Sequence, residues 1–414
     1  MNNSRMIKKW VFLSFVYLIL VGFLGCLLRL IFFYPIEGVN FKYFLHGHSH
    51  LAFLGWLFNA FFAALVFTYV PEKAKTYKIM FWLLQVAVMG MLITFPIQGY
   101  AAASITFSTL HILLSYWFAG KFLRDTNKLH NRPLSLVFIR WGLLFMVLSS
   151  IGPFALGAIM AKGLGGSDLY QLAIYFYLHF QYDGWFSFAV FGLFFRILEI
   201  NDIAFSNGHA RRFLWLMLIA CIPAYSLSTL WTQPHTYVYV IGFLSAILQL
   251  MALFYLMLII KRAGKDMQTK LTPWTVRLFQ FAYVSFIIKI LLQFASAFPT
   301  IADLAFTVRN FTIGYLHIVF LGFVSTFLIG WFAQVNLISI NSKLAKSGIV
   351  FFLLGFILSE AIIFLQPTLF MAGLGMLPFY FEGLFWVSLL MPVGVLFLVS
   401  GVRFLITKVP ITGH

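Results

Sequence analysis

Long apolar runs alternate with short polar segments along the whole chain. A membrane-spanning helix needs roughly 20 apolar residues, because it rises about 1.5 Å per residue through a hydrocarbon core about 30 Å thick. About twelve runs meet this requirement. They cover residues 10–33, 43–70, 79–96, 102–122, 134–161, 170–197, 213–231, 237–260, 274–298, 309–335, 348–366 and 382–406. The pattern predicts an all-α integral membrane protein with about twelve transmembrane helices.

Prolines and the polar segments divide these runs. Proline at positions 71, 133, 234, 273 and 367 predicts that a helix ends or begins there. No polar block is long enough to fold by itself, so residues 1–414 are expected to form a single transmembrane domain. The basic start followed by an apolar run resembles a signal peptide, but the run is too long and lacks an evident cleavage site. We expect it to be the first membrane helix.

Composition agrees with a lipid environment, and the placement of charge adds an orientation. Only 9% of the residues are charged, against roughly 25% in soluble domains. Most of the 28 basic residues fall before the first run or after an even-numbered one. Those expected on the opposite side are Arg29, Lys42, Lys162 and Arg309. The positive-inside rule therefore places both termini in the cytoplasm, and the net charge of +17 requires no nucleic-acid partner. Cys26 and Cys221 lie in apolar runs and indicate neither a disulfide framework nor a cysteine metal site.

Histidines recur at one depth on the descending spans. The ten histidines are His46, His48, His50, His111, His130, His179, His209, His235, His317 and His414. His50, His111, His179 and His317 each follow an expected outer boundary by eight or nine residues, or roughly 12 Å. Imidazole is a common ligand for heme iron and copper, and a buried polar ring needs a partner in lipid. The alternative is that each ring bonds a carbonyl of a neighbouring helix.

Three of these histidines share a local sequence. His50, His179 and His317 each have glycine five residues later and an aromatic residue six residues later. The intervals of 129 and 138 residues each contain four spans, which predicts three pseudo-repeats of four helices. The glycine would let a planar group approach the backbone closely. Near the first repeat, His46 and His50 share one helix face and His48 points the opposite way. His50 is favoured because it holds the repeat position, and His48 is the second candidate.

Twelve spans in a threefold repeat, with histidines on spans two, six and ten, resemble the catalytic subunit one of the heme–copper oxidase superfamily. That subunit is subunit I in cytochrome c oxidase, and the closest branch is the nitric oxide reductase large subunit. The resemblance covers the whole chain in topology but only short patches in sequence. It implies that His50 and His317 hold the iron of one low-spin heme b and that Arg309 pairs with a propionate. It also matches His179 and Asp183 to a nonheme-metal motif, which makes a second metal at His179, with His235 or His111, a further hypothesis.

Three departures from the family limit the chemistry that it implies. Tyr315 stands where the family has a second histidine in span ten, and His235 stands alone where the family has a histidine pair. Gln249 stands where a catalytic glutamate is expected, although a tyrosine ligand at Tyr315 would be an alternative for a second iron. We therefore expect electron transfer or redox or gas sensing in a bacterial inner membrane, rather than reduction of oxygen or nitric oxide. The electron donor would be a quinol or a cytochrome, and enzymatic activity and oligomeric state stay open.

Asp183, Lys289 and Glu360 lie within expected spans, where charges are costly and must pair, neutralise or line a polar cavity. A pair between Lys289 and Asp183 and a proton relay are the structural and functional alternatives. Intramembrane charges also favour the main rival class, a secondary transporter. A membrane protein of metal homeostasis or nitric oxide response is the third class.

Overall fold

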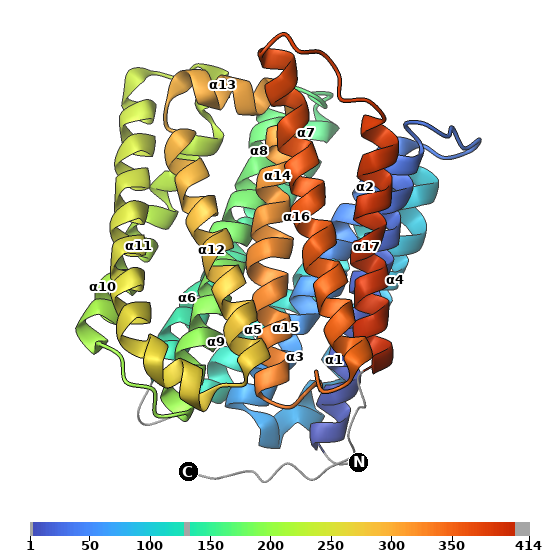
Figure 1. The fold of residues 1–414 in the computed structure, drawn as a ribbon. Coiled ribbons are helices and arrows are strands. Elements are labelled where there is room, and N and C mark those ends of the chain that lie inside the picture. Colours follow the sequence, from blue (N-terminus) through green and yellow to red (C-terminus); the bar gives the residue numbers. More distant parts are fainter. Residues whose placement is uncertain (1–2, 128–132, 402–414) are drawn as a thin grey trace. The chain divides into compact units, whose positions relative to one another are not determined.

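The structure, a computed structural model, describes residues 3–127 and 133–401. Helices account for 86% of it, and the described ranges contain no strand, which confirms the all-α fold (Figure 1). Contacts group the chain into two compact units, one of residues 1–129 and 332–414 and the other of residues 130–331. We describe each unit by itself. Outside the described residues lie Lys128, His130, Arg132, Arg403, Lys408 and His414.

Ten helices among the described residues are long and apolar enough to cross a membrane. They are Asn3–Leu30, Phe41–Tyr69, Pro71–Gln98, Ala102–Thr126, Leu134–Ala161, Thr236–Lys270, Pro273–Ala295, Arg309–Gln334, Lys343–Met371 and Tyr380–Gly401. The other two expected spans take different forms. The first is a helical run from Asp168 to Ile200 with polar residues at its centre, and the second is the 15-residue helix Asn207–Cys221 followed by 3-10 turns. The chain is thus a multi-pass membrane protein by the length and composition of its helices.

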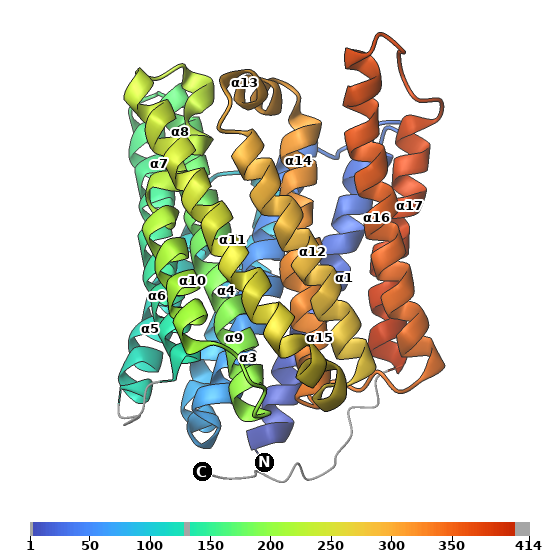
Figure 2. The same ribbon diagram turned by 60° about the vertical axis from the view of Figure 1, so that its left-hand side comes forward.

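The unit of residues 1–129 and 332–414, called unit 1, is built around its first helix. Its elements are α1 (Asn3–Leu30), α2 (Phe41–His50), η1 (Leu51–Phe58), α3 (Asn59–Tyr69), η2 (Pro71–Lys73), α4 (Ala74–Gln98), α5 (Ala102–Thr126), α16 (Lys343–Met371) and α17 (Tyr380–Gly401). Helix α1 packs against α17 and against α2 and η1, and α4 packs against α5. Helices α16 and α17 lie side by side (Figures 1 and 2). A methyl group on Gly394 would lie 2.6 Å from the carbonyl oxygen of Gly348, so glycine sets the close approach of this pair.

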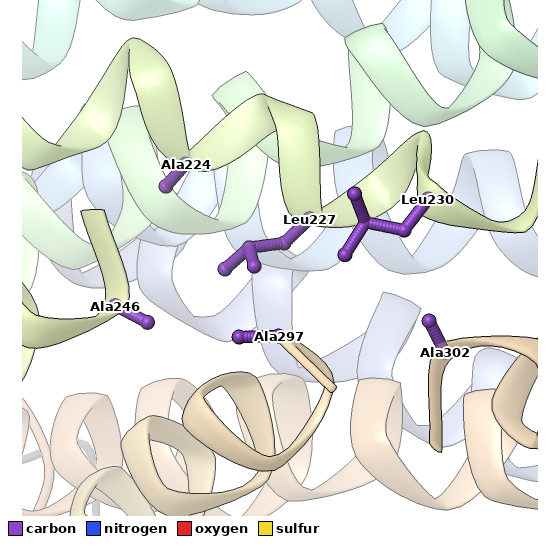
Figure 3. Packing of buried hydrophobic residues seen from close by; sticks show 6 residues of the cluster. All are labelled: Ala224, Leu227, Leu230, Ala246, Ala297 and Ala302. Atoms are coloured by element: carbon purple, nitrogen blue, oxygen red, sulfur yellow. The ribbon is translucent and has the colours of Figure 1, made fainter. Parts of the chain in front are cut away.

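The unit of residues 130–331, called unit 2, holds the central polar residues. Its elements are α6 (Leu134–Ser149), α7 (Ile151–Ala161), α8 (Asp168–His179), η3 (Phe180–Phe186), α9 (Ser187–Ile200), α10 (Asn207–Cys221), η4 (Pro223–Ser228), η5 (Leu230–Thr232), α11 (Thr236–Lys270), α12 (Pro273–Ala295), α13 (Pro299–Thr307), α14 (Arg309–His317), η6 (Ile318–Ser325) and α15 (Thr326–Gln334), the last of which ends in unit 1. The 3-10 turns after α10 pack onto α11, onto α13 and onto the connection before α13 through apolar side chains (Figure 3). This cluster comprises Ala224, Leu227, Leu230, Ala246, Ala297 and Ala302.

Three π-helices interrupt three of the long helical runs. They are η1, η3 and η6, and each begins at the residue after His50, His179 or His317. A π-helix is rare and wider than an α-helix, and it is often found at functional sites. The residue that follows each π-helix is polar and bonds a carbonyl inside it. Asn59 bonds Gly55 at 2.8 Å, Ser187 bonds Tyr182 at 2.6 Å and Thr326 bonds Leu321 at 2.9 Å.

Prolines mark the ends of helices where they are expected to, with one exception. Pro133 is the N-cap of α6 and Pro273 is the first residue of α12. The break expected at Pro367 is wrong, because α16 continues through it to Met371. Proline this close to the end removes one hydrogen bond from the last turns only. The helix stops before Gly373, whose φ of 72° and the bond from Leu374 N to Leu369 O form a glycine C-cap.

Candidate functional site

A buried polar cluster lies at the centre of unit 2. It consists of His179 at the end of α8, Asp183 in η3, and Lys289 and Gln293 one turn apart on α12. The exposed fractions of His179, Asp183 and Lys289 are 0%, 2% and 0%. Lys289 Nζ donates to Asp183 Oδ1 and, at 2.6 Å, to Gln293 Oε1. Gln293 Nε2 in turn donates to Asp183 Oδ2 at 2.8 Å.

The C-terminal end of a neighbouring helix, α10, completes this cluster. Helix α10 ends at Cys221, just before Pro223, so the last carbonyl groups of α10 lack partners within the helix. His179 Nε2 lies 2.7 Å from the Cys221 carbonyl oxygen and satisfies it. His179 Nδ1 lies 3.2 Å from Asp183 Oδ2, one turn further along the chain. The cluster therefore joins α8, η3, α10 and α12.

The pair of Lys289 with Asp183 was one alternative that the sequence left open, and the structure contains it. A buried ion pair holds only when both charges also find hydrogen bonds, because desolvation is costly. Gln293 meets this need on both sides, since its amide accepts from the ammonium and donates to the carboxylate. Sequence spacing places Gln293 one turn from Lys289, but it does not reveal which helix supplies the acid.

Both ring nitrogens of His179 face protein groups of this cluster. A carbonyl oxygen only accepts hydrogen bonds, so Nε2 carries a proton and has no lone pair for a metal. Nδ1 faces a carboxylate. His235, one proposed co-ligand, is exposed at the start of α11 and stacks on Tyr237 at 5.8 Å. Across the described ranges, His, Cys, Asp and Glu side chains form no group of three that would hold a metal ion.

In unit 1, the structure distinguishes the three histidines of α2. His48 Nδ1 lies 3.0 Å from the carbonyl oxygen of Val21 on α1, and its ring rests on Gly25, where a methyl group would come within 3.1 Å of it. His50 Nε2 instead bonds the hydroxyl of Tyr100 at 2.9 Å. His46 packs edge-on against the same tyrosine, with ring centres 4.5 Å apart. His48 and His50 therefore face different helices, as their spacing predicts.

The orientation of His48 is the one that a ligating histidine usually has. Because its Nδ1 donates to a carbonyl, the lone pair lies on Nε2. His50 is partly buried and stacks on Phe95, with ring centres 4.3 Å apart. Its Nε2 becomes a ligand only if Tyr100 gives up its hydrogen bond. His111, the remaining histidine at this depth, is 1% exposed and packs edge-on against Phe58.

The other expected cofactor residues lie on α14 in unit 2. His317 is the last residue of α14 and is partly buried. Arg309 is the first residue of the same helix and is exposed, roughly 12 Å from His317 along the helix axis. Tyr315 packs against Tyr182 with ring centres 5.6 Å apart, so its side chain has a packing role in this unit.

Side chains occupy the space beside two of the repeat glycines, from a neighbouring helix at both and also from the same π-helix at Gly55. A methyl group on Gly55 would lie 2.8 Å from Leu51 Cδ1 and 3.2 Å from the Tyr17 ring. One on Gly184 would lie 2.5 Å from Phe145 Cβ. Helix packing thus explains both glycines without the planar group that the sequence suggested.

Two charged side chains within the helices of unit 1, Arg29 and Glu360, lie near each other in a way that the sequence does not indicate. Glu360 on α16 is 7% exposed, and Arg29 at the end of α1 is its electrostatic neighbour. Arg29 Nη1 also donates to the carbonyl of Leu384 on α17 at 3.2 Å. Arg29 had been placed at the outer edge by its position alone, and no local pattern links residues more than 300 positions apart.

No protein-family model matches the chain, and no curated protein matches it in a sequence search.

Proposed function

We propose that the protein is a membrane heme b protein of the heme–copper oxidase subunit-one type, with one low-spin heme between His317 and a histidine of α2. One observation supports this best. His50, His179 and His317 each end an α-helix just before a π-helix, but only His50 and His317 are partly accessible. His179 is fully buried and faces protein groups on both sides. The two accessible positions are the two that the resemblance assigns to iron.

The residues present suit such a cofactor by their chemistry. Two imidazoles are the donor set of a bis-histidine heme. On α2, His50 holds the repeat position, whereas His48 has the ring orientation that ligation requires. Arg309 would pair with a propionate as a charge-assisted donor. The bound group would supply a reversible one-electron couple.

If two histidines held the iron, no coordination position would stay open for a gas or a substrate. The proposal is therefore electron transfer or redox sensing, and not reduction of oxygen or nitric oxide. Tyr315 and Gln249, at the positions where the family has reactive groups, agree with this restriction. A quinol or a cytochrome would be the electron donor.

The finer topology belongs to the same proposal. Twelve spans in three pseudo-repeats of four, with cytoplasmic termini, would place the chain in a bacterial inner membrane. The distribution of basic residues supports the orientation. The recurrence of a histidine, a π-helix and a capping polar residue supports the repeats.

The test is a reduced-minus-oxidised visible spectrum of the purified protein in detergent, with heme extraction from the same sample. We expect a low-spin b-type signal at about one heme per chain. His317→Ala should abolish it, and one of His48→Ala and His50→Ala should do the same. His235→Ala, on an exposed residue, is the matched control. A clean wild-type protein without heme refutes the proposal.

A secondary transporter is the second candidate, and the buried polar cluster of unit 2 is what favours it. Charged side chains buried within membrane helices mark transport sites. Absence of heme together with substrate-dependent uptake in proteoliposomes, lost in Asp183→Asn, would establish this class instead.

A further inference from the structure

We propose that an anionic phospholipid binds unit 2 where α10 begins and α11 ends, with its phosphate on basic side chains and its acyl chains on the apolar faces of these two helices. Helices α10 and α11 lie side by side in unit 2 (Figure 1). The residues concerned belong to one unit, and none of them is a proposed ligand of the heme. The proposal therefore does not depend on the proposed function.

Five exposed basic side chains lie at this end of the helix pair. They are Arg211 and Arg212 on α10 and Lys261, Arg262 and Lys265 on α11, and we call them the basic patch. A cation–π contact joins the two helices there, because the guanidinium of Arg212 lies over the Tyr255 ring of α11, 5.5 Å from its centre. Lys261 follows Tyr255 by roughly 9 Å along the helix axis. The basic patch therefore combines cations from both helices.

The chain supplies no carboxylate to the basic patch. All 11 acidic residues lie within the described ranges, and none of them forms a salt bridge with its five side chains. Asp266 is next to the patch in sequence, but its Oδ2 accepts from the backbone N–H of Ala204 at 3.4 Å. In unit 1, by contrast, Lys73 and Lys121 both bond Asp125. The positive charge of the patch is thus available to an anion from outside the chain.

Exposed apolar side chains continue from the basic patch along both helices. On α10, Trp215 and Ile219 follow Arg212 by three and seven residues, so they share its helix face. On α11, Phe254 and Met257 precede Lys261 by seven and four residues and share the face of that lysine in the same way. Helix α11 is long and apolar enough to cross a membrane, so its exposed face would meet lipid acyl chains.

The depth of Arg212 is the reason that it needs an anion. Tyr255, over which its guanidinium lies, precedes Ile260, the last residue of the apolar run of α11, by five residues or roughly 8 Å. A cation this far inside an apolar run is costly unless a polar or charged group meets it. The anion must therefore reach the boundary between water and hydrocarbon.

A phospholipid meets this requirement and also fits the apolar faces. Its phosphate lies at that boundary, and its acyl chains would cover Trp215 and Phe254. Inorganic phosphate and nucleic acid have no apolar part for these faces. The positive-inside rule places this end of unit 2 at the cytoplasmic leaflet, whose surface carries anionic lipids.

The test measures how phospholipids with brominated acyl chains quench the fluorescence of Trp215 in mixed micelles of the purified protein. The difference between each protein and its own Trp215→Phe partner isolates this residue among the 11 tryptophans of the chain. We expect brominated phosphatidylglycerol to quench Trp215 at a lower mole fraction than brominated phosphatidylcholine. Each cation beside an anionic headgroup strengthens its binding about fivefold, so Arg211→Gln with Arg212→Gln should lower this preference by roughly an order of magnitude.

The matched control is Lys75→Gln with Lys78→Gln, which removes the same charge from exposed positions at the start of α4 and should keep the preference. If the arginine variant is not monodisperse, Lys261→Gln with Arg262→Gln removes two cations of the patch from the other helix and should have the same effect.

The proposal is overturned if wild type shows no preference for the anionic lipid, if the arginine variant keeps the preference, or if the lysine control loses it equally. Inorganic phosphate exchanged for chloride at constant ionic strength should leave the quenching unchanged. Displacement of the lipid by phosphate would assign the patch to a free anion and would overturn the proposal as well.

Discussion

Removal of one charge from the buried polar cluster should destabilise the protein far more than removal of both. Lys289→Met leaves the Asp183 carboxylate buried without its cation, and Asp183→Asn leaves the ammonium without its anion. Two unit charges about 4 Å apart attract by about 4 kcal/mol at the effective dielectric constant of roughly 20 that describes most protein sites. Loss of one partner of a buried pair typically costs about 3–5 kcal/mol.

The double variant is expected to be close to wild type. Replacement of both members of a buried pair by neutral groups of similar size is often neutral or stabilising. Each single substitution should therefore lower stability by about 3 kcal/mol or more, while the two together change it by about 1 kcal/mol. The coupling free energy from this cycle would be several kcal/mol, well above the usual range for distant sites of about 0.3–0.5 kcal/mol.

The assay is thermal unfolding of the four purified proteins in one detergent, with gel filtration to confirm that each is monodisperse before heating. Ser285→Ala is a suitable control, because this buried residue lies one turn before Lys289 on α12 and bonds only its own helix, at Phe281 O. It should change the melting temperature little. If the stability loss in the double variant equals the sum of the losses in the two single variants, the two charges do not stabilise each other. That result would refute the prediction.

Two further substitutions test the packing and the π-helices. Gly394→Ala should separate α16 from α17 and lower the melting temperature by several degrees, because the new methyl group would meet backbone atoms, whereas Gly383→Ala on the same helix meets nothing within 4 Å and should be neutral or stabilising. Thr326→Val should cost about 1 kcal/mol, because it removes the hydroxyl that bonds Leu321 O inside η6. Thr106→Val, whose hydroxyl bonds a carbonyl of an ordinary α-helix, should cost less. Equal losses in Thr326→Val and Thr106→Val would contradict the capping role.

The helices themselves were the part of the fold most open to prediction. A run of about 20 apolar residues has few alternatives in lipid, where backbone groups must bond within the segment. The boundary at Pro367 was wrong because glycine chemistry at Gly373 ends the helix, and proline so near the end costs little. The run through Asp183 is polar at its centre, and its partner Lys289 lies on another helix, so local hydropathy does not show how it is stabilised.

The π-helices were not predicted, although part of their signal is present in the sequence. Each expected histidine is followed eight or nine residues later by Asn59, Ser187 or Thr326, which bond carbonyls in the widened turns. A lone polar residue in an apolar run is an ordinary feature of membrane helices. Its meaning emerges only when the three segments are compared with each other and with the geometry.

The three histidines also show where local sequence stops being informative. His50, His179 and His317 share the glycine, the aromatic residue and the π-helix, so the local pattern reproduces the backbone each time. The role of each ring is decided by a neighbour that the pattern does not contain. Tyr100 meets His50, and the unpaired end of α10 at Cys221 meets His179. If α10 ended one turn later, a backbone N–H of the same helix would bond the Cys221 carbonyl. His179 would then lose this hydrogen bond. The role of His179 thus depends on where α10 ends, and Pro223 sets that end.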